Sequence, residues 1–528
     1  MGGQKLSGTF GDNFLEFIQY QFYPIGAVDL VTYFFRRSFD IIKERGFQSL
    51  ISTNTIAQGK ARKDGLDIIL KQGGNINHAI KSMKWPGIAA VEVALVTVTK
   101  QYWNGIFVLG GRIVDTITTY LDNSEEQGNP FKLKMNEGKS FQGSIVLGKG
   151  FILDPDRAQS LIAKDPRNKD VLFPFLNGDD LNNNYDQSPS RWVINFHDWS
   201  EEKAKTYSDC YEILERLVKP DRIAKKGDRG AEFWWQFLRI RKELYQSITP
   251  FKNVLVIPET TKYLTFAFCP TDIVFSHANK IIVTDEFDFF SILKSSIHLY
   301  WVWKNSSTLE SRMKYITSDA FEIFPFPINL KIENKQSLNK IGEDYYEYRK
   351  KLTKELKLGF TKTYNSINNG DIFEKNIDTN LKHLDKKTIE EKFGKETWNF
   401  WNHLQKTEGT CLWEEAVNGI VRLRELHKEM DVAVLEAYGW TDIQLRHDFY
   451  EVDYLPENDR VRYTIHPDAR KQILKRLLEL NHLYFEEEAK QGLHKQKDVE
   501  AFYEQKGQPI PEDVAKWFKK GKGKARTT

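Results

Sequence analysis

Two neighbouring residues, Ser276 and His277, are the first candidates for nucleophilic or acid-base chemistry. A histidine beside a serine can act as a general base, but this one has no apparent carboxylate partner to orient it. Glu201 and Lys203 have the residue types of a metal-dependent nuclease, yet they lie in a polar segment predicted to be helical, without a paired aspartate. We therefore predict neither a Ser-His hydrolase nor a nuclease, and no metal site.

Composition limits the partners and the compartment. Lys and Arg number 76 against 73 Asp and Glu, so no overall positive field indicates nucleic acid, and any DNA contact must use a locally basic groove. The N-terminus lacks a signal peptide's basic and apolar regions, and no stretch approaches the roughly 18 apolar residues of a membrane span. We therefore predict no membrane partner. No zinc or disulfide spacing relates the cysteines Cys210, Cys269 and Cys411, which indicates a reducing compartment, so we predict a cytoplasmic protein.

The elements that must position any site begin with an α/β pattern. At roughly 100 to 200 residues per domain, 528 residues predict about three domains. Apolar residues at helical spacing predict a helix from Asp29 to Gly46, and FQSLIS at 47–52 predicts a strand whose polar end would open onto a ligand crevice. Ala89–Val98 suits a strand covered on both faces, and Ile106–Leu109 a further short strand.

Residues 1–115 are thus predicted to be the last part of an α/β sheet domain. No Gly-rich strand-to-helix turn precedes Asp29, so we expect another polypeptide to complete the sheet, or the chain to be a fragment. Residues 116–330 have short β-prone runs broken by Gly, Pro and Asn clusters such as NGDDLNNN, which is typical of a mixed α+β domain. The predicted strands there are 192–196, 254–258, 264–268 and 280–284.

Residues 331–528 are predicted to be mainly helical. The best amphipathic candidates are Trp413–Met430 and Asp468–Glu488. The chain ends in the basic sequence KKGKGKARTT, which either attracts phosphates without specificity or is simply solvated.

Segments spread along most of the chain resemble, in order, the MmeI-like adenine-specific DNA methyltransferases of restriction-modification and phage defence. The opening MGGQKLSG resembles the stretch that directly follows the NPPF catalytic motif of that family. The other similar segments are ISTNTIAQG, FPFLNGDDLNNN, SPSRWVINF, ERLVKPDR, VLVIPETTKYLTFAF, LESRMKY followed by FPFP, LHKEMDVAVLEAYGW and LLELNHLYFEEE.

The resemblance implies a fold and a chemistry. Residues 1–115 would be the C-terminal part of a class I, Rossmann-like methyltransferase domain, 116–330 the DNA target-recognition domain and 331–528 a helical region. Such enzymes flip an adenine out of double-stranded DNA and transfer a methyl group directly from S-adenosylmethionine to its exocyclic nitrogen. The NPPF loop and the glycine-rich cofactor loop would lie before Met1, so we expect no independent methyl transfer and a possible upstream methyltransferase polypeptide as partner.

The resemblance also places residues at two sites in the first segment. Gly2, Gly3 and Lys5 would form a loop after the catalytic motif at the edge of the target-base pocket, although a flexible start is an equal alternative. Asn54 and Gln58 would face the same pocket, whereas such polar residues more often satisfy backbone groups. The pair Asp29 and Leu30 would border the cofactor, but Asp29 taken alone is better explained as a helix cap.

The predicted DNA contacts lie farther along the chain. Arginine and lysine can hold phosphates or read guanine edges, and the sequence does not separate these roles. For Arg312 and Lys314 we favour DNA contact over a solvated turn, and for Trp192 and Tyr263 we favour the core. The residues that match the recognition segment of the family are Arg191, Lys262, Ser276, His277, Arg312 and Lys314.

The function predicted from the sequence is therefore a component of a site-specific adenine-N6 DNA methyltransferase. The alternative is a non-enzymatic DNA-binding specificity subunit, or a truncated remnant of such an enzyme.

Overall fold

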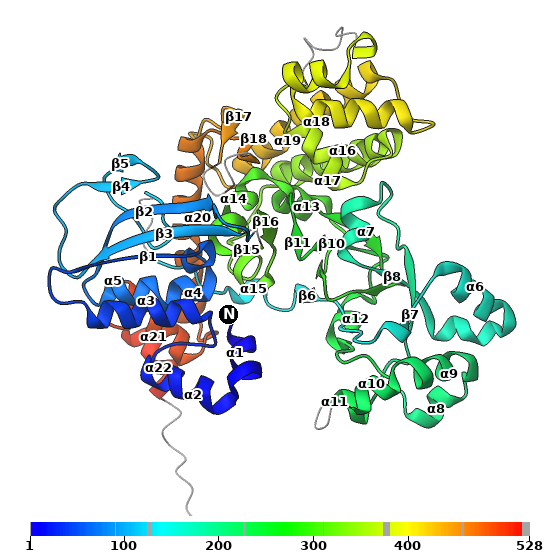
Figure 1. Ribbon diagram of the computed structural model, residues 1–528, viewed down its shortest axis with the longest axis horizontal. Coiled ribbons are helices and arrows are strands. Elements are labelled where there is room, and N and C mark those ends of the chain that lie inside the picture. The colour runs from blue at the N-terminus through cyan, green and yellow to red at the C-terminus, as the bar shows by residue number, and fades with distance from the viewer. Residues whose placement is uncertain are drawn as a thin grey trace, which may run out of the picture. The chain divides into compact units, whose positions relative to one another are not determined.

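A computed structural model describes the chain at residues 2–89, 91–123, 128–224, 229–309, 311–372, 381–452, 455 and 459–519. The chain divides into two compact units, each built from segments distant in sequence. The first unit comprises Met1–Met135, Ser296–Pro325 and Asp442–Thr528, and the second comprises Asn136–Ser295 and Phe326–Thr441 (Figure 1). The segment predicted for target recognition, 116–330, contributes to both units.

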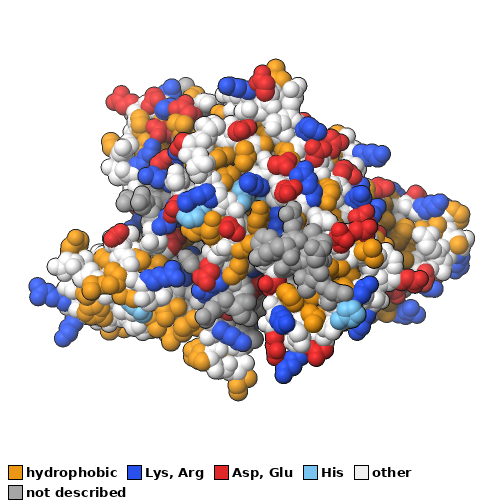
Figure 2. Space-filling view, turned by 90° about the horizontal axis from the view of Figure 1, so that it is seen from above, with side chains coloured by type: hydrophobic (Ala, Val, Ile, Leu, Met, Phe, Trp, Pro, Cys, Tyr) orange, Lys and Arg blue, Asp and Glu red, His pale blue; other side chains and the backbone are white. Residues whose placement is uncertain are grey.

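Each unit mixes helices with small sheets, as the sequence predicts at the level of a mixed α/β fold. On the face in Figure 2, acidic and basic side chains are interspersed, with hydrophobic patches between them. Among the described residues, no helix combines the length and apolar character needed to cross a membrane. The basic C-terminal sequence lies outside the described residues.

Five strands form the sheet of the first unit. Strand β3 pairs antiparallel with both β1 and β2, so β1 and β2 run in the same direction on either side of it, and β2 pairs parallel with β4. The sheet order is β1-β3-β2-β4-β5. The strands are β1 (Phe47–Thr53), β2 (Asn75–Lys84), β3 (Glu92–Thr99), β4 (Phe107–Leu109) and β5 (Arg112–Val114).

Helices cover one face of this sheet. Val96 and Val98 of β3 are fully buried in one cluster with Phe35 and Phe39 of α3. On the opposite face of β1, Phe47 and Ile51 are both half exposed. On the same face of β3, Val93 and Thr99 are buried while Leu95 and Thr97 are half-buried, so cover on both faces of this strand stays a prediction. The covering helices and the turn that precedes two of them are α3 (Leu30–Ile41), η1 (Asn54–Ala57), α4 (Gly59–Asp64) and α5 (Leu66–Lys71).

The start of the chain also departs from the prediction. Residues expected to form a loop make helix α1 (Gly3–Phe10), which is followed by α2 (Asp12–Gln21). Leu6 of α1 is fully buried in a small cluster with Ile18 and Val28. Glycine disfavours helix, at roughly 1 kcal/mol per residue, but burying an apolar anchor of this kind offsets that cost.

The remaining parts of the first unit come from the middle and the end of the chain. Phe131 and Leu133 pack into an apolar cluster with Phe485 and Phe502 of the C-terminal helices. The elements are η2 (Lys134–Asn136), which ends one residue beyond the unit, then α14 (Ser296–Asn305), β15 (Ser307–Leu309), β16 (Arg312–Lys314), α15 (Thr317–Ala320), β17 (Asp448–Glu451), β18 (Val461–Thr464), α20 (Pro467–Lys490), α21 (Gln496–Gln505) and α22 (Glu512–Lys519).

Polar side chains of α20 hold the segment around Phe131 in place. The Asn481 amide accepts from the Phe131 backbone N–H and donates to its carbonyl, both at 2.8 Å. The Glu488 carboxylate accepts from the backbone amides of Lys134 and Met135, at 2.8 and 2.9 Å, and lies 2.8 Å from Nε2 of His494. Side chains of α20 thereby satisfy backbone groups of Phe131 and of the first two residues of η2.

The second unit contains two four-stranded sheets. The first has the order β12-β10-β14-β6 and is antiparallel throughout. The second has the order β13-β8-β9-β7, in which only β13 and β8 are parallel. The strands of this unit are β6 (Ser140–Gln142), β7 (Ile152–Leu153), β8 (Leu172–Leu176), β9 (Arg191–Ile194), β10 (Asn253–Pro258), β11 (Thr260–Thr261), β12 (Ala267–Pro270), β13 (Val274–Phe275) and β14 (Asn279–Ile282).

Helices surround these sheets and form a bundle after them. The short helices are η3 (Lys149–Phe151), α6 (Pro155–Lys164), η4 (Pro166–Asp170), α7 (Gly178–Asn183), α8 (Glu201–Lys205), α9 (Ser208–Leu217), α10 (Lys219–Ile223), α11 (Arg229–Glu232), α12 (Lys242–Ile248) and α13 (Phe287–Lys294). The bundle comprises α16 (Ile332–Leu356), α17 (Phe360–Ile367), η6 (Leu381–His383), α18 (Lys386–Lys406) and α19 (Trp413–Ala437).

One predicted loop of this unit is partly helical. Within NGDDLNNN, Asn177 accepts from the backbone of Asp179 and Asp180, while the Asp180 carboxylate accepts from the Asn177 backbone N–H, which makes a capping box for α7. The Asn-rich composition that indicates a loop here also supplies the cap that starts a helix.

The Glu488 contacts lead to a pH-dependent prediction. Burial raises the pKa of its carboxyl, but His494 and the two backbone amides together lower that pKa below its ordinary value. Because the folded-state pKa is lowered, the stabilisation is present above the ordinary glutamate pKa and is lost as the pH falls through the folded value. We expect Glu488→Gln to lower the melting temperature at pH 7, and the difference from wild type to shrink below about pH 4.

The matched control is Glu487→Gln, which removes an exposed carboxylate paired with Lys490 on the same helix. An equal loss of stability from both variants at pH 7 would contradict a special role for Glu488.

Candidate nucleic-acid interface

The second unit brings three of the predicted DNA contacts to one edge of a sheet. Arg191 starts β9 opposite Phe175 of β8, and Phe175 in turn pairs with Val274 of β13. Because β8 and β13 run parallel and β9 runs against them, the start of β9 and the ends of the other two lie at the same edge. Ser276 and His277 directly follow β13, and the Arg191 side chain is exposed.

Ser276 and His277 have different surroundings. Ser276 is buried, and its Oγ accepts from the backbone N–H of Ala278 at 3.2 Å, so its hydroxyl supports a turn. The His277 backbone donates to the carbonyl of Ser144 at 2.8 Å, while its imidazole is exposed. Among the described residues no hydrogen bond joins the two side chains.

Lys262 is committed to a contact inside the unit. Its Nζ donates to Oδ1 of Asn365 at 3.0 Å, and the same oxygen accepts from the Tyr263 hydroxyl at 2.8 Å. Tyr263 is buried, as predicted for the core, whereas Trp192 is only partly buried against its cluster. Lys262 therefore ties a loop to α17, and a role in DNA contact stays a prediction.

A close crossing of three segments lies next to this edge. The Gly143 N–H donates to the Asn279 carbonyl at 3.1 Å, and the Ser144 N–H to that of Phe275 at 2.8 Å. A Cβ at position 143 would lie 2.2 Å from the Ser276 carbonyl oxygen, so only glycine fits there. The next residue, Ile145, exchanges two backbone hydrogen bonds with Arg239, at 3.1 and 3.2 Å.

The Arg222 side chain fixes the segments on both sides of that crossing. Only 4% of Arg222 is exposed, and its guanidinium donates to the carbonyl oxygens of Val146, Leu147, Phe233, Trp234 and Gln236. The shortest of these bonds, to Gln236, is 2.6 Å. Arg222 belongs to the ERLVKPDR segment, to which the sequence assigned no role.

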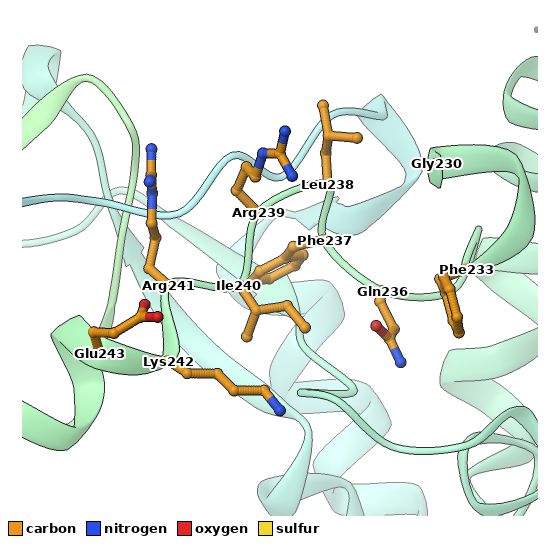
Figure 3. A pocket seen from close by; sticks show the side chains of 10 residues that line it. All are labelled: Gly230, Phe233, Gln236, Phe237, Leu238, Arg239, Ile240, Arg241, Lys242 and Glu243. Atoms are coloured by element: carbon orange, nitrogen blue, oxygen red, sulfur yellow. The ribbon is translucent and has the colours of Figure 1, made fainter. Parts of the chain in front are cut away.

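A pocket of about 260 Å³ opens beside the residues that Arg222 holds. Figure 3 shows Arg239 and Arg241 pointing to the same side of the chain, with Ile240 between them pointing the other way. Arg241 has a left-handed backbone (φ 62°), and one of its terminal nitrogens donates to Oε1 of Gln142 at 3.0 Å. The lining residues are Gly230, Phe233, Gln236, Phe237, Leu238, Arg239, Ile240, Arg241, Lys242 and Glu243.

Sequence reasoning missed Arg239 and Arg241. The run LRIRK at 238–242 carried the signal, because two arginines that alternate with apolar residues in an extended segment point to one side.

In the first unit, the predicted contacts Arg312 and Lys314 lie on a β-hairpin. Strand β16 pairs antiparallel with β15, and Arg312 is exposed while Met313 between them is buried. The following residue, Tyr315, is fully buried with its hydroxyl 3.0 Å from Nε2 of His298. Burial lowers the pKa of His298 to about 3, so this histidine is neutral near pH 7 and adds no charge beneath the hairpin.

Gln58 holds this hairpin from a distant part of the chain. Its Oε1 accepts from the Thr308 backbone N–H at 2.9 Å, and its Nε2 donates to Oγ1 of Thr308 at 3.0 Å. The structure thus joins Gln58, predicted at the edge of a base pocket, to the hairpin that carries Arg312 and Lys314. The amide serves to position the hairpin, and a contact with a base stays a prediction.

The other residues predicted in the first unit lie near its helix starts. Asn54 begins η1 directly after β1, where its side chain is partly exposed. Gly2 caps α1, Gly3 begins it, and Lys5 is exposed on it.

The two residues predicted to border the cofactor have local contacts of their own. Oδ1 of Asp29 accepts from the Val31 backbone N–H at 3.1 Å, which is the capping role that the sequence favours. Leu30 packs beside the cluster of Leu6, Val28 and Tyr33. These contacts alone do not make a site for S-adenosylmethionine, and that cofactor stays a prediction from the resemblance.

Comparison with known proteins identifies the central part of the chain. Residues 127–328 match the family model described as the MmeI target recognition domain. The resemblance to MmeI predicted from the sequence is thereby confirmed for this segment. No curated protein matches the chain in sequence.

Solved structures extend the likeness in fold. The structure of the Type IIL restriction-modification enzyme MmeI in complex with DNA matches with a TM-score of 0.63 and 16% sequence identity. The match covers 89% of this chain and 54% of that one, so the chain spans about half the length of MmeI. The Type IIG restriction endonuclease BpuSI matches with a TM-score of 0.27 and 10% identity, over 79% of this chain and 50% of that one.

The Arg222 contacts lead to a stability prediction for the second unit. We expect Arg222→Met to leave several buried carbonyl groups without donors and to lower the free energy of unfolding by about 3–5 kcal/mol. Urea unfolding followed by tryptophan fluorescence, to which the buried Trp234 and Trp235 contribute, measures the change. The control, Arg216→Met, replaces an exposed arginine on α9 and should change little; equal curves for both variants would contradict the role of Arg222.

Proposed function

We propose that this chain selects the target site of an adenine-specific DNA methyltransferase of the restriction-modification type. The observation that carries the proposal is the match of residues 127–328 to the MmeI target recognition domain. The likeness in fold between this chain and MmeI, whose structure contains DNA, supports double-stranded DNA as the partner.

The placement of the basic residues supports two contact regions for DNA. In the second unit, Arg191 and His277 share one sheet edge with exposed side chains. In the first unit, the two hydrogen bonds between Gln58 and Thr308 fix the hairpin that carries Arg312 and Lys314. Basic side chains on loops and strand ends suit recognition when the backbone that carries them is fixed before the duplex arrives.

Methyl transfer requires further elements. The acceptors of the NPPF loop and the glycine-rich cofactor loop would be supplied by a methyltransferase portion, on this polypeptide or on a separate one. In the first unit, β1 lies at one end of the sheet order, and its own residues Phe47 and Ile51 are half exposed. A sheet edge of this kind accepts further strands, and we infer that the methyltransferase portion adds to the sheet there.

Two measurements test the proposed function. Fluorescence anisotropy with a selected pool of duplexes should show binding of the purified chain to one sequence over unrelated ones at stated salt. Labelled methyl from S-adenosylmethionine should enter adenine of that sequence when a polypeptide with the NPPF and glycine-rich loops is present. Specific binding without any methylation would favour the specificity-subunit alternative, and absence of binding would overturn the proposal.

Arg312 provides a residue-level prediction. We expect Arg312→Gln to weaken binding of the selected duplex by about 1–3 kcal/mol. If Arg312 reads a base, specificity relaxes at one position; if it holds a phosphate, affinity falls equally for all sequences. The control is Arg112→Gln, which changes an exposed arginine on another hairpin strand of the same unit. Affinity that is unchanged by Arg312→Gln would remove this residue from the interface.

A further inference from the structure

We propose that the pocket lined by residues 230–243 binds a phosphate group of the DNA backbone, with Arg239 and Arg241 as its contacts. This inference rests on the proposed function and adds a contact that the sequence did not indicate. It concerns a site within the second unit alone.

The charges around the pocket leave an excess of cations. Three basic residues line it, of which Lys242 is paired with Asp198 at 2.5 Å. Arg239 and Arg241 then face one carboxylate, Glu243. The exposed Arg239 guanidinium makes no hydrogen bond or ion pair with any residue in the described part of the chain.

The backbone presents both arginines in a fixed way. The paired hydrogen bonds between Ile145 and Arg239 hold the segment extended, and the side chains two residues apart point together (Figure 3). Gln142 orients Arg241 by one nitrogen of its guanidinium. A left-handed conformation is costly for arginine, so a side chain kept at φ 62° is consistent with a functional demand at this position.

The shape and the chemistry favour a phosphate over a nucleobase. A volume of about 260 Å³ admits a protruding phosphate but is far too small for a duplex. The planar guanidinium fork matches phosphate oxygens in geometry and charge. A base would need polar partners along its edge, yet Nε2 of Gln236 already donates to the Trp199 carbonyl at 2.9 Å.

The test is the salt dependence of duplex binding by the full chain. Each phosphate contact adds about 0.9 to the slope of log affinity against log salt. We expect Arg239→Gln to reduce that slope by about 0.9 and to weaken selected and unrelated duplexes by the same factor. Arg239→Lys should keep most of the slope because it keeps the charge. The matched control, Arg157→Gln, changes an exposed arginine on α6 of the same unit and should leave the slope unchanged.

The outcomes separate this proposal from the proposed function. If wild type binds duplex DNA but Arg239→Gln, with an unchanged melting temperature, keeps the wild-type slope, the phosphate site is wrong and the function stands. A loss confined to the selected sequence assigns Arg239 to base recognition and also overturns the phosphate site. If Arg239→Gln does not fold, Arg241→Gln removes the other proposed contact, and a folded Arg241→Gln variant that keeps the wild-type slope contradicts the phosphate site. If wild type binds no duplex, both proposals fail.

Discussion

A buried guanidinium organises the second unit. The two segments that Arg222 joins, around residues 146 and 235, have carbonyl groups without a continuous strand ladder, and such groups must find donors when they are buried. Arginine suits this task because it offers five donors on one rigid plane. Arg424 performs a similar task in the helical bundle, where it donates to the carbonyls of Ile367, Ile372 and Asn369. The loop that leads to Arg239 therefore depends on a side-chain donor for its shape.

Much of the fold could be predicted from periodicity. The predicted helices at Asp29–Gly46 and Trp413–Met430 correspond to α3 and α19, because long amphipathic patterns are decided locally. The strand β2 was missed, since its alternation is weak and its pairing with β3 contains register shifts. Helix α1 was also missed, because its stability comes from burying Leu6 rather than from glycine-rich sequence. The Rossmann-like character of the sheet stays a prediction.

The candidate site could be predicted only in part. The resemblance predicted Arg191, His277 and Arg312 as DNA contacts, and that role stays a prediction; it did not indicate how the backbone that carries them is held. The contact between Gln58 and Thr308 joins positions 250 residues apart, and no local pattern reports such a pair. The role of Gly143 is equally non-local, because its need for glycine arises from the Ser276 carbonyl. Side chains that position a site are set by tertiary packing, which sequence spacing alone does not determine.

The hydrogen bonds between Gln58 and Thr308 join the segment that matches the target recognition domain to a residue outside it. Thr308 lies inside residues 127–328, whereas Gln58 lies outside them. A chimaera that imports this segment from a relative would keep the bond from the backbone N–H with any residue except proline at 308, but would lose the hydroxyl partner unless serine or threonine stands there. Exchange of specificity by recombination is thus constrained at position 308, which need not contact DNA. Whether a donor segment is compatible with the recipient depends partly on Gln58, which lies outside the exchanged segment.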